Sequence, residues 1–531
     1  MPKSLYLINP RPSSPSYFGA EAFEHHGYPM AQAIADLATS TVAALAPPDW
    51  TVTICEEYVD PIDWDVDADF VGLTGKVIQG QRIAEVADEF RRRGKTVIIG
   101  GPHASLSPGS VRDHCDVLVI GELESIADAF FSDLERGTWK REYVAERPDL
   151  ETSPLPRFDL YPNRRALSGC VQTSRGCPFE CEFCDVIQYL GRRQRHKSVA
   201  QIVAELDALY EIGFRAVFLA DDNFTVYRKR AKAVLAALAD WNANRPDGPV
   251  AFHTQVSIDA ARDPEIMRLC GEAGLTRVFI GIETPNEESL RETHKRQNVG
   301  IDLVEQVEVF LAHGISVTGG MIVGFDHDGP GIFELQYDFA MATPIPIFTL
   351  GALVAPAATP LYDRMKANGR LVEDGGPERT IGVWSTNILP TMMTREQLFD
   401  GLKWLGNRLY QPAAFGRRVL AMIERMGPQL GPFKSGYRPH QAREVEAQAR
   451  GVIRKMLARG PEERRMFQAL SKAMSAKPEA GPMVMNALFS YAQVRCLYDA
   501  DRYWDPEVVD RAPVPDLMAP PAGVEMASVA V

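Results

Sequence analysis

Three cysteines within eight residues constrain this chain more than any other feature of its sequence. Cys177, Cys181 and Cys184 follow a short apolar run, and Gly176 and Pro178 favour a tight turn beside them. The spacing brings the three sulfurs to one side of a loop. Three thiolates in that arrangement can hold an iron–sulfur cluster and leave its fourth iron without a protein ligand.

Three other interpretations of this loop are weaker. Zinc normally takes four ligands, and a disulfide would pair only two of the three thiols, so both need partners that the loop lacks. A chance grouping of cysteines is the third interpretation. It leaves the tight turn and the aromatic Phe183 beside the sulfurs unexplained.

The spacing resembles the cluster motif of the radical S-adenosylmethionine (SAM) enzymes. The resemblance implies that Cys177, Cys181 and Cys184 bind a [4Fe-4S] cluster whose open iron is chelated by the amino and carboxylate groups of SAM. It also implies that Phe183 packs near the adenine of SAM.

A series of alternating strands and helices starts at the triad. Amphipathic helical patterns separate the apolar runs, and the first of these helices begins at the predicted cap Ser198. Six such units predict a partial (β/α)6 barrel of the TIM type over residues 167–365, with catalytic residues at the carboxyl ends of its strands. The predicted strands are residues 171–174, 216–220, 251–256, 278–282, 316–323 and 347–354.

Acidic and amide residues follow several of these strands, among them Asp222 after the second and Glu283 after the fourth. In a mostly dry pocket they can accept hydrogen bonds from the ammonium and ribose hydroxyls of SAM. Paired acids could instead serve a hydrolase as general acid and base, but the nearby cysteine triad already accounts for them. The resemblance points to Asp222 and Glu283 as contacts of SAM.

Residues 1–140 predict a separate α/β domain. Short apolar runs alternate with helical patterns such as residues 83–90, as in a doubly wound, Rossmann-like parallel sheet. Sheets of this kind bind ligands at the carboxyl ends of their strands. The predicted strands are residues 5–8, 52–55, 70–73, 97–99 and 117–120.

The ends of these strands carry glycines and polar residues in an order that resembles the cobalamin-binding domain of some radical SAM enzymes. The resemblance implies cobalamin as a cofactor, and the missing Asp-x-His-x-x-Gly motif implies that no histidine binds the cobalt from below. His103 is either a contact of the corrin or its tail, or a structural loop residue. The implied contacts are Thr74, Gln79, Gly100, Gly101, His103, Gly121 and Glu122.

The rest of the chain carries weaker signals. Prolines punctuate residues 141–166 and predict a linker, residues 366–510 predict a mainly helical extension, and residues 511–531 predict a disordered tail. The chain up to about residue 425 resembles cobalamin-dependent radical enzymes that include the hopanoid methylases. Ala357 and Ala358 stand where such proteins often have glycine, and this leaves the substrate open.

Composition excludes some classes of partner. A net charge of -13 and a pI near 5.4 argue against nucleic acid as the main ligand. No apolar run is long enough to cross a bilayer, so we expect a cytoplasmic protein, peripheral to the membrane if its substrate is a lipid. The remaining cysteines lie among apolar neighbours, which suits buried side chains in a reducing compartment; they are Cys55, Cys115, Cys170, Cys270 and Cys496.

The resemblance implies a cobalamin-dependent radical SAM methyltransferase. In such enzymes a 5′-deoxyadenosyl radical takes hydrogen from an unreactive carbon, and cobalamin delivers the methyl group. The expected partners are a small-molecule substrate, a lipid or natural product, and a one-electron reductant such as flavodoxin or ferredoxin. Two alternatives stay open at this stage: an oxidative cyclase or rearrangement enzyme on the same cofactors, and a non-catalytic cobalamin or redox sensor, which the intact triad disfavours.

Overall fold

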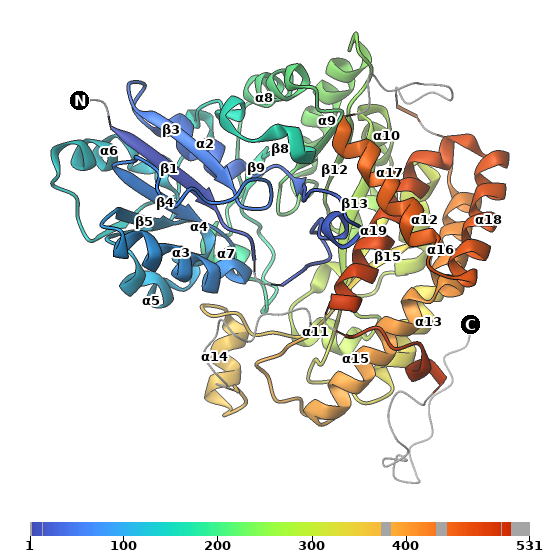
Figure 1. The fold of residues 1–531 in the computed structure, drawn as a ribbon. Helices are drawn as coiled ribbons and strands as arrows, with labels where there is room; N and C mark the ends of the chain where they lie inside the picture. Colours follow the sequence, from blue (N-terminus) through green and yellow to red (C-terminus); the bar gives the residue numbers. More distant parts are fainter. Residues whose placement is uncertain are drawn as a thin grey trace.

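The computed structural model describes residues 3–372, 384–431 and 443–510, apart from the single positions 13, 429 and 501. Two parallel β-sheets dominate the fold. Figure 1 shows the N-terminal sheet in blue beside a second sheet in green and yellow, with the C-terminal helices in orange and red packed on the second sheet. The expected α/β class is confirmed. The predicted tail, residues 511–531, lies outside the described residues.

The N-terminal sheet is parallel throughout and has the strand order β3-β1-β4-β5-β6-β7. All five predicted strands are present, and β7 adds a sixth inside the segment that was predicted to be a linker. The strands are β1 (Ser4–Asn9), β3 (Thr51–Glu56), β4 (Phe70–Thr74), β5 (Thr96–Gly100), β6 (Val117–Ile120) and β7 (Glu142–Val144).

Helices cover both faces of this sheet, as a doubly wound fold requires. On one face α3 (Gly80–Arg92) buries Phe90 against strand residues such as Ile8. On the other face α6 (Ala127–Arg136) buries Phe131 in a separate, larger core. Because successive strand residues point to opposite faces, β1, β3, β4, β5 and β6 each contribute side chains to both cores.

The second sheet has the order β15-β14-β13-β12-β11-β8-β2, and from β8 to β15 its strands are neighbours in the same order as in the chain. This is the predicted partial barrel. Helices between the strands cover its outer face; they include α8 (Val199–Ile212), α9 (Arg228–Ala243), α10 (Pro264–Ala273), α12 (Leu303–Ala312) and α13 (Ile332–Ala342). The strands are β8 (Ala166–Val171), β11 (Ala216–Leu219), β12 (Ala251–Gln255), β13 (Leu275–Glu283), β14 (Ser316–Val323) and β15 (Ile347–Ala352).

The first barrel strand lies earlier in the chain than predicted. β8 ends at Val171, whereas the sequence pattern predicted a strand over residues 171–174. The Asp221 carboxylate accepts hydrogen bonds from the backbone N–H groups of Thr173 (2.7 Å) and Ser174 (2.9 Å). These bonds replace sheet pairing, so the chain leaves the barrel sheet there and approaches the cysteine loop.

A short strand that the sequence did not predict extends the barrel sheet. β2 (Gln32–Ile34) pairs in parallel with β8, although it precedes most of the N-terminal sheet in the chain. The residues before it also pack away from the N-terminal sheet, because Gln493 donates to the backbone oxygen of Ser16 (2.8 Å) and accepts from the N–H of Ala22 (3.0 Å). The N-terminal segment therefore contributes to the barrel and to the C-terminal helices.

The C-terminal part is helical, as expected. The last long helix, α19 (Gly481–Ala500), is buried over most of its length, with Tyr491 and Tyr498 at 0% exposure. Its aromatic stretch therefore packs in the core. The helices after the barrel are α15 (Arg395–Tyr410), α16 (Pro412–Arg425), α17 (Glu444–Leu457), α18 (Pro461–Ala476) and α19 (Gly481–Ala500).

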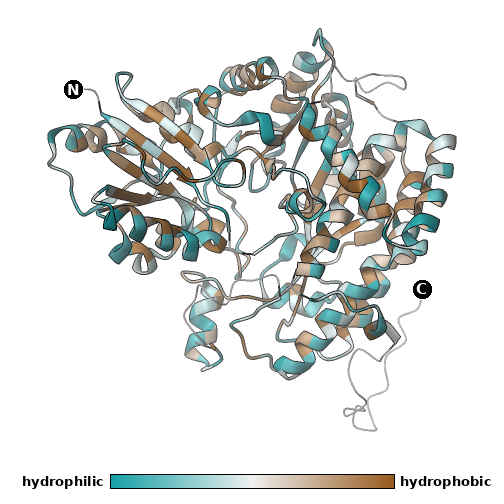
Figure 2. Ribbon diagram, in the orientation of Figure 1, coloured by the Kyte–Doolittle hydropathy of each residue, from teal (hydrophilic) through white to brown (hydrophobic). Residues whose placement is uncertain are grey.

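Hydropathy follows this architecture. Figure 2 shows apolar residues along the strands and mixed polar and apolar faces on the surrounding helices. Such two-faced helices bury one side against a sheet and expose the other. Among the described residues, no helix combines the length and apolarity that crossing a bilayer requires.

Candidate active site

The cysteine loop lies between β9 (Ser174–Arg175) and the short helix α7 (Val186–Tyr189). The N–H of Cys177 donates to the Gly191 oxygen (3.1 Å) and that of Cys184 to the Cys181 oxygen (3.1 Å). Gly176 has a φ of +99°, and a Cβ there would lie only 2.8 Å from the Gly191 oxygen. Only glycine suits that position, which explains the Arg-Gly-Cys turn.

The three thiols are close enough to influence one another. Burial and the neighbouring Cys181 raise the pKa of Cys177, and burial, Asp185 and Cys181 raise the pKa of Cys184 to about 12. Gln297 donates to the Cys181 sulfur at 3.6 Å. Cys181 is 7% exposed. The three thiols thus lie near one another in a partly buried region.

This donor set fits an iron–sulfur cluster. Among the described residues, no three His, Cys, Asp or Glu side chains converge on a single ion, as a mononuclear zinc site would require. Thiolates that bind three different irons of one cluster stand further apart than the ligands of one ion. The zinc interpretation of the loop is therefore disfavoured by geometry as well as by ligand number.

A buried ion pair lies beside the thiols. Glu283, at the end of β13, has a φ of +64°, which is uncommon for a residue with a side chain, and its carboxylate lies 2.7 Å from the Lys295 ammonium. The two side chains are 8% and 13% exposed. Burial opposes the charge on Lys295, but Glu283 and then Cys181 and Cys184 outweigh it and raise its pKa. Lys295 is thus a cation beside the cluster loop.

Two consecutive acids after β11 have different surroundings. Asp221 is bound to the backbone before the cysteine loop, as described above, and so has a structural role. Asp222 accepts a hydrogen bond from the N–H of Gly176 (3.0 Å), and burial raises its pKa to about 6. The predicted SAM contacts Asp222 and Glu283 both lie beside the cysteine loop, although their contact with SAM remains a prediction.

A single arginine after the barrel holds the middle of the cysteine loop. Arg364, on α14 (Pro360–Ala367), binds the Glu182 carboxylate with two hydrogen bonds (2.7 and 2.9 Å) and also reaches Glu292 (3.0 Å) and Asp326 (2.6 Å). Glu182 stands between Cys181 and the predicted adenine contact, Phe183. The pairing fixes the loop between two of the cysteines.

Phe183 lies at the mouth of the barrel. Its ring centroid is 6.3 Å from that of Phe325, which follows β14, and it packs at the edge of a small apolar cluster there. Phe183 itself is only partly buried. Part of the ring is therefore accessible, which is compatible with the predicted adenine contact.

The predicted cobalamin contacts gather at the carboxyl edge of the N-terminal sheet. Gly101 has a φ of +89°, and a Cβ there would overlap the Thr74 hydroxyl oxygen, so these two positions meet closely. Gly100 ends β5 in an extended conformation directly before α4 (Gly101–Leu106). Backbone without side chains is thus exposed to any ligand at this edge.

Gln79 and His103 make contacts within their own domain. The amide of Gln79 donates to the Asn9 side chain (2.8 Å) and accepts from the N–H of Lys76 (2.7 Å). His103 is fully buried, and its Nε2 lies 3.1 Å from the Ser110 hydroxyl. These contacts fit the structural alternative for His103, while a cofactor contact at either residue remains a prediction.

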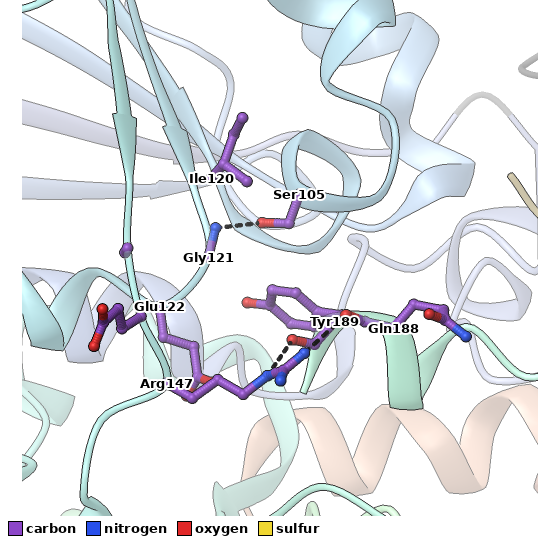
Figure 3. A pocket seen from close by; sticks show the side chains of 9 residues that line it. Ser105, Ile120, Gly121, Glu122, Arg147, Gln188 and Tyr189 are labelled. Atoms are coloured by element: carbon purple, nitrogen blue, oxygen red, sulfur yellow. Dashed lines mark hydrogen bonds between the residues drawn. The ribbon is translucent and has the colours of Figure 1, made fainter. Parts of the chain in front are cut away.

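A pocket of about 370 Å³ lies between this edge and the end of the cysteine loop. Figure 3 shows Gly121 and Ser105 on one side, joined by a hydrogen bond from the Gly121 N–H to the Ser105 hydroxyl (2.9 Å), and Tyr189 of α7 on the other. Arg147 donates to the backbone oxygens of Gln188 (3.2 Å) and Tyr189 (3.4 Å). The residues that line the pocket are Ser105, Ile120, Gly121, Glu122, Ala145, Glu146, Arg147, Gln188 and Tyr189.

The sequence did not identify several residues of this site. Lys295, Arg364, Arg147 and Tyr189 stand in loops or short helices without a distinctive local pattern, and each acquires its role from a partner distant in the chain or from the pocket. The Arg-Gly-Cys turn and the acids at strand ends were recognisable because their signals are local.

A parallel partial barrel with three thiols after its first strand is the fold and site of a radical SAM enzyme. The profile of the radical SAM superfamily matches residues 171–334, and a domain of unknown function (DUF4070) matches residues 359–495. The hopanoid C-2 methylase of Rhodopseudomonas palustris is 32% identical over 419 residues, which cover 76% of this chain and 77% of that protein.

Two further relatives are also described as methyltransferases. An uncharacterized methyltransferase of Synechocystis is 38% identical over 340 residues, and the chain spans 63% of that protein's length, with 63% of this chain aligned. A bacteriochlorophyllide d C-12(1)-methyltransferase of Chlorobaculum tepidum is 28% identical and aligns over 61% of this chain and 72% of its own length.

Solved structures share the fold. The cobalamin-dependent SAM radical enzyme OxsB has a TM-score of 0.58 at 15% identity and covers 94% of this chain and 80% of its own. The radical SAM methyltransferase TsrM of Kitasatospora setae, solved with cobalamin and a [4Fe-4S] cluster, has a TM-score of 0.53 at 18% identity and covers 69% and 78%. The chain belongs to the radical SAM superfamily, within the methyltransferase family that includes the hopanoid C-2 methylase. The predicted resemblance is confirmed.

Proposed function

We propose that this protein methylates an unactivated carbon of a largely apolar small molecule, and that it uses a [4Fe-4S] cluster, SAM and cobalamin. The observation that carries the proposal is the joining of the cysteine loop to the cobalamin-type domain across the pocket between Gly121 and Tyr189. When bound, the cluster supplies the electron that cleaves SAM, and cobalamin supplies the methyl group.

The residues around the loop have defined tasks in this proposal. Cys177, Cys181 and Cys184 hold three irons, and Asp222 and Glu283 offer carboxylate oxygens to the donors of SAM. Lys295 orients the Glu283 carboxylate through its 2.7 Å contact. The low exposure of Glu283 and Lys295 keeps water away from their ion pair and strengthens that electrostatic contact.

The stoichiometry of by-products tests the reaction class. If one SAM is cleaved and another donates its methyl group, each methylated product requires one 5′-deoxyadenosine and one S-adenosylhomocysteine, after uncoupled cleavage is subtracted. Anaerobically reconstituted protein, dithionite and a cell extract supply the assay, and mass spectrometry identifies a product that has gained one CH2 unit. Deuterium at the reacting carbon should appear in 5′-deoxyadenosine.

Product that forms with 5′-deoxyadenosine but without S-adenosylhomocysteine would rule out methyl transfer in favour of a cyclase or rearrangement enzyme. Failure of the reduced protein to cleave SAM at all would favour a sensor. A flavodoxin or ferredoxin is the proposed physiological reductant, and replacement of dithionite by either protein tests that partner. The fold is compatible with each of these reaction classes, whereas the relatives described as methyltransferases favour methyl transfer.

A further inference from the structure

The inner face of the barrel carries side chains that the proposed chemistry does not use. On β13, Val278, Ile280 and Ile282 are 0% exposed and belong to the main core with the outer helices. Since side chains alternate along a strand, Arg277 and Phe279 point to the opposite, inner face. Both are only partly buried.

Aromatic rings on this inner face do not join the core. The Phe279 ring lies 5.6 Å from Phe18, and the Phe218 ring lies 5.1 Å from His253. Phe18 is 59% exposed, and none of the three phenylalanines belongs to a hydrophobic cluster of the described chain. Phe218 and Phe279 are partly buried. Partly exposed aromatic side chains that lie together outside the core are typical of a surface that binds a ligand.

Arg277 is a cation without a partner on the same face. It stands opposite His253 in the register of β12 and β13. Within the described chain its guanidinium has no hydrogen bond, ion pair or acidic neighbour, and burial alone lowers the pKa of Arg277. Burial and the Arg277 charge hold the pKa of His253 well below its usual value, so the imidazole is neutral there.

A cation enclosed by the barrel without a counter-charge is costly, because it loses part of its hydration and gains no ion pair in return. Natural sequences retain such groups where function needs them, and an anionic ligand would remove the penalty. A guanidinium matches the two oxygens of a carboxylate in a planar, bidentate geometry. One unpaired charge suits a monoanion better than the near-dianion of a phosphate monoester.

We propose that Arg277 binds a carboxylate of the substrate, whose apolar body lies along Phe18, Phe218 and Phe279. Arg277 stands six residues before Glu283 on β13, a separation of roughly 20 Å along the strand. The substrate is therefore an elongated apolar acid, with its carboxylate deep in the barrel and its reacting carbon near the cysteine loop. This substrate class rests on the proposed function, because it assumes that the barrel interior receives the substrate.

A fluorescent polyene acid tests the site without knowledge of the natural substrate. cis-Parinaric acid is a long apolar carboxylate whose emission rises in a dry site, and its methyl ester is the neutral counterpart. We expect the full-length, reconstituted protein to bind the acid about tenfold more tightly than the ester, as a charge-assisted bidentate contact predicts. Arg277→Gln should abolish this preference, and Arg277→Lys should keep part of it.

Two controls separate the site from nonspecific binding. Arg465→Gln removes an exposed arginine whose side chain is 71% accessible, and it should leave the preference for the acid unchanged. Phe279→Ala should weaken the binding of the acid and of the ester by similar factors, because the substitution removes apolar contact and no charge. Equal affinity of wild-type protein for acid and ester, or a preference that persists in Arg277→Gln, would overturn the proposal.

Thermal unfolding of the ligand-free protein provides a second measurement. Because Arg277 has no partner, Arg277→Gln should melt at or above the wild-type temperature. A lower melting temperature together with an unchanged preference for the acid would assign Arg277 a structural role and overturn the proposal. The proposed reaction is tested separately in wild-type protein: absence of SAM cleavage there would refute the reaction class and leave the binding result intact.

Discussion

The carboxylate of Glu122 accepts a hydrogen bond from the guanidinium of Arg175 (2.6 Å), and so joins the end of β6 to the residue before the cysteine turn. Arg195, on β10 (Arg195–His196), adds two contacts to the same carboxylate (2.6 and 3.0 Å). The side chains of Glu122, Arg175 and Arg195 are only 2%, 12% and 13% exposed. These contacts of Glu122 hold the N-terminal, cobalamin-type domain against the loop that carries the three cysteines.

Glu122→Gln should loosen this junction. The substitution leaves Arg195 without a carboxylate partner in a dry interface and leaves Arg175 with Glu124 alone (2.8 Å). Breaking a buried pair in this way costs about 3–5 kcal/mol. We expect faster hydrogen exchange in residues 174–196 and weaker binding of added cobalamin. The matched control is Glu180→Gln, whose ion pair with Arg192 is 49% and 59% exposed and should contribute little. Equal exchange in the two variants would contradict the proposed role.

Replacement of Cys181 by alanine should abolish the cluster, because three protein thiolates are the minimum set that leaves one iron open. Iron content and the visible absorption of anaerobically reconstituted protein measure the effect. Cys55→Ala and Cys270→Ala are the controls, since both thiols are buried (3% and 1% exposed) and Cys270 lies in the core of the barrel. They should keep the cluster and lower stability at most. A full cluster in Cys181→Ala protein would show that the assignment is wrong.

The sequence predicted those parts of the molecule whose signals are local. Apolar runs of three to eight residues located ten strands correctly, including residues 316–323 of β14, and Ser198 caps α8 as expected. The first barrel strand was predicted too late in the chain, over residues 171–174, whereas β8 ends at Val171. The chain leaves the sheet there because Thr173 binds Asp221, about fifty residues later, and such a distant contact has no local signal. β2 was not predicted, because three residues at the edge of a sheet are too few to show the alternation of apolar and polar side chains that marks a strand.

Roles that depend on distant partners were not predictable. Glu122 was expected to contact cobalamin, and the structure shows that its carboxylate pairs with two arginines on the strands either side of the cysteine loop, Arg175 of β9 and Arg195 of β10. The importance of Arg277 depends on the lack of a partner, which no sequence pattern reveals. The role of Lys295 was not predictable either, because a lysine in a short loop has no distinctive sequence pattern and acquires its role only from its contact with Glu283.

Lys295→Met should make the cluster harder to reduce. The ammonium is a buried positive charge near Cys181 and Cys184, and a nearby cation favours the more negative, reduced state. We expect the midpoint potential to fall by tens of millivolts or more, measured by redox titration with paramagnetic resonance. Lys295→Arg retains the charge and should stay close to the wild-type value. An unchanged potential in Lys295→Met would mean that the ammonium serves only to orient Glu283.

The last prediction concerns Glu56, a fully buried acid at the end of β3. Burial, then the Asp36 charge, raise its pKa to about 8, although the Asn9 amide (2.7 Å) and the Tyr161 hydroxyl (3.0 Å) donate to the carboxylate. The folded protein thus keeps a proton that the unfolded chain releases above about pH 4.3. The stabilisation is complete below that pH and is lost as the pH rises through about 8.

Between pH 5 and 7.5 the Glu56 proton should therefore lower the free energy of unfolding by about 1.4 kcal/mol for each unit of rising pH. Glu56→Gln mimics the neutral acid and should remove this contribution, so that its advantage over wild type grows with pH in urea unfolding. Asp65→Asn, at a side chain that is 92% exposed, is the control and should follow the wild-type profile. If Glu56→Gln and wild-type protein lose stability in parallel from pH 5 to 7.5, Glu56 is ionised in the folded protein and the predicted proton is absent.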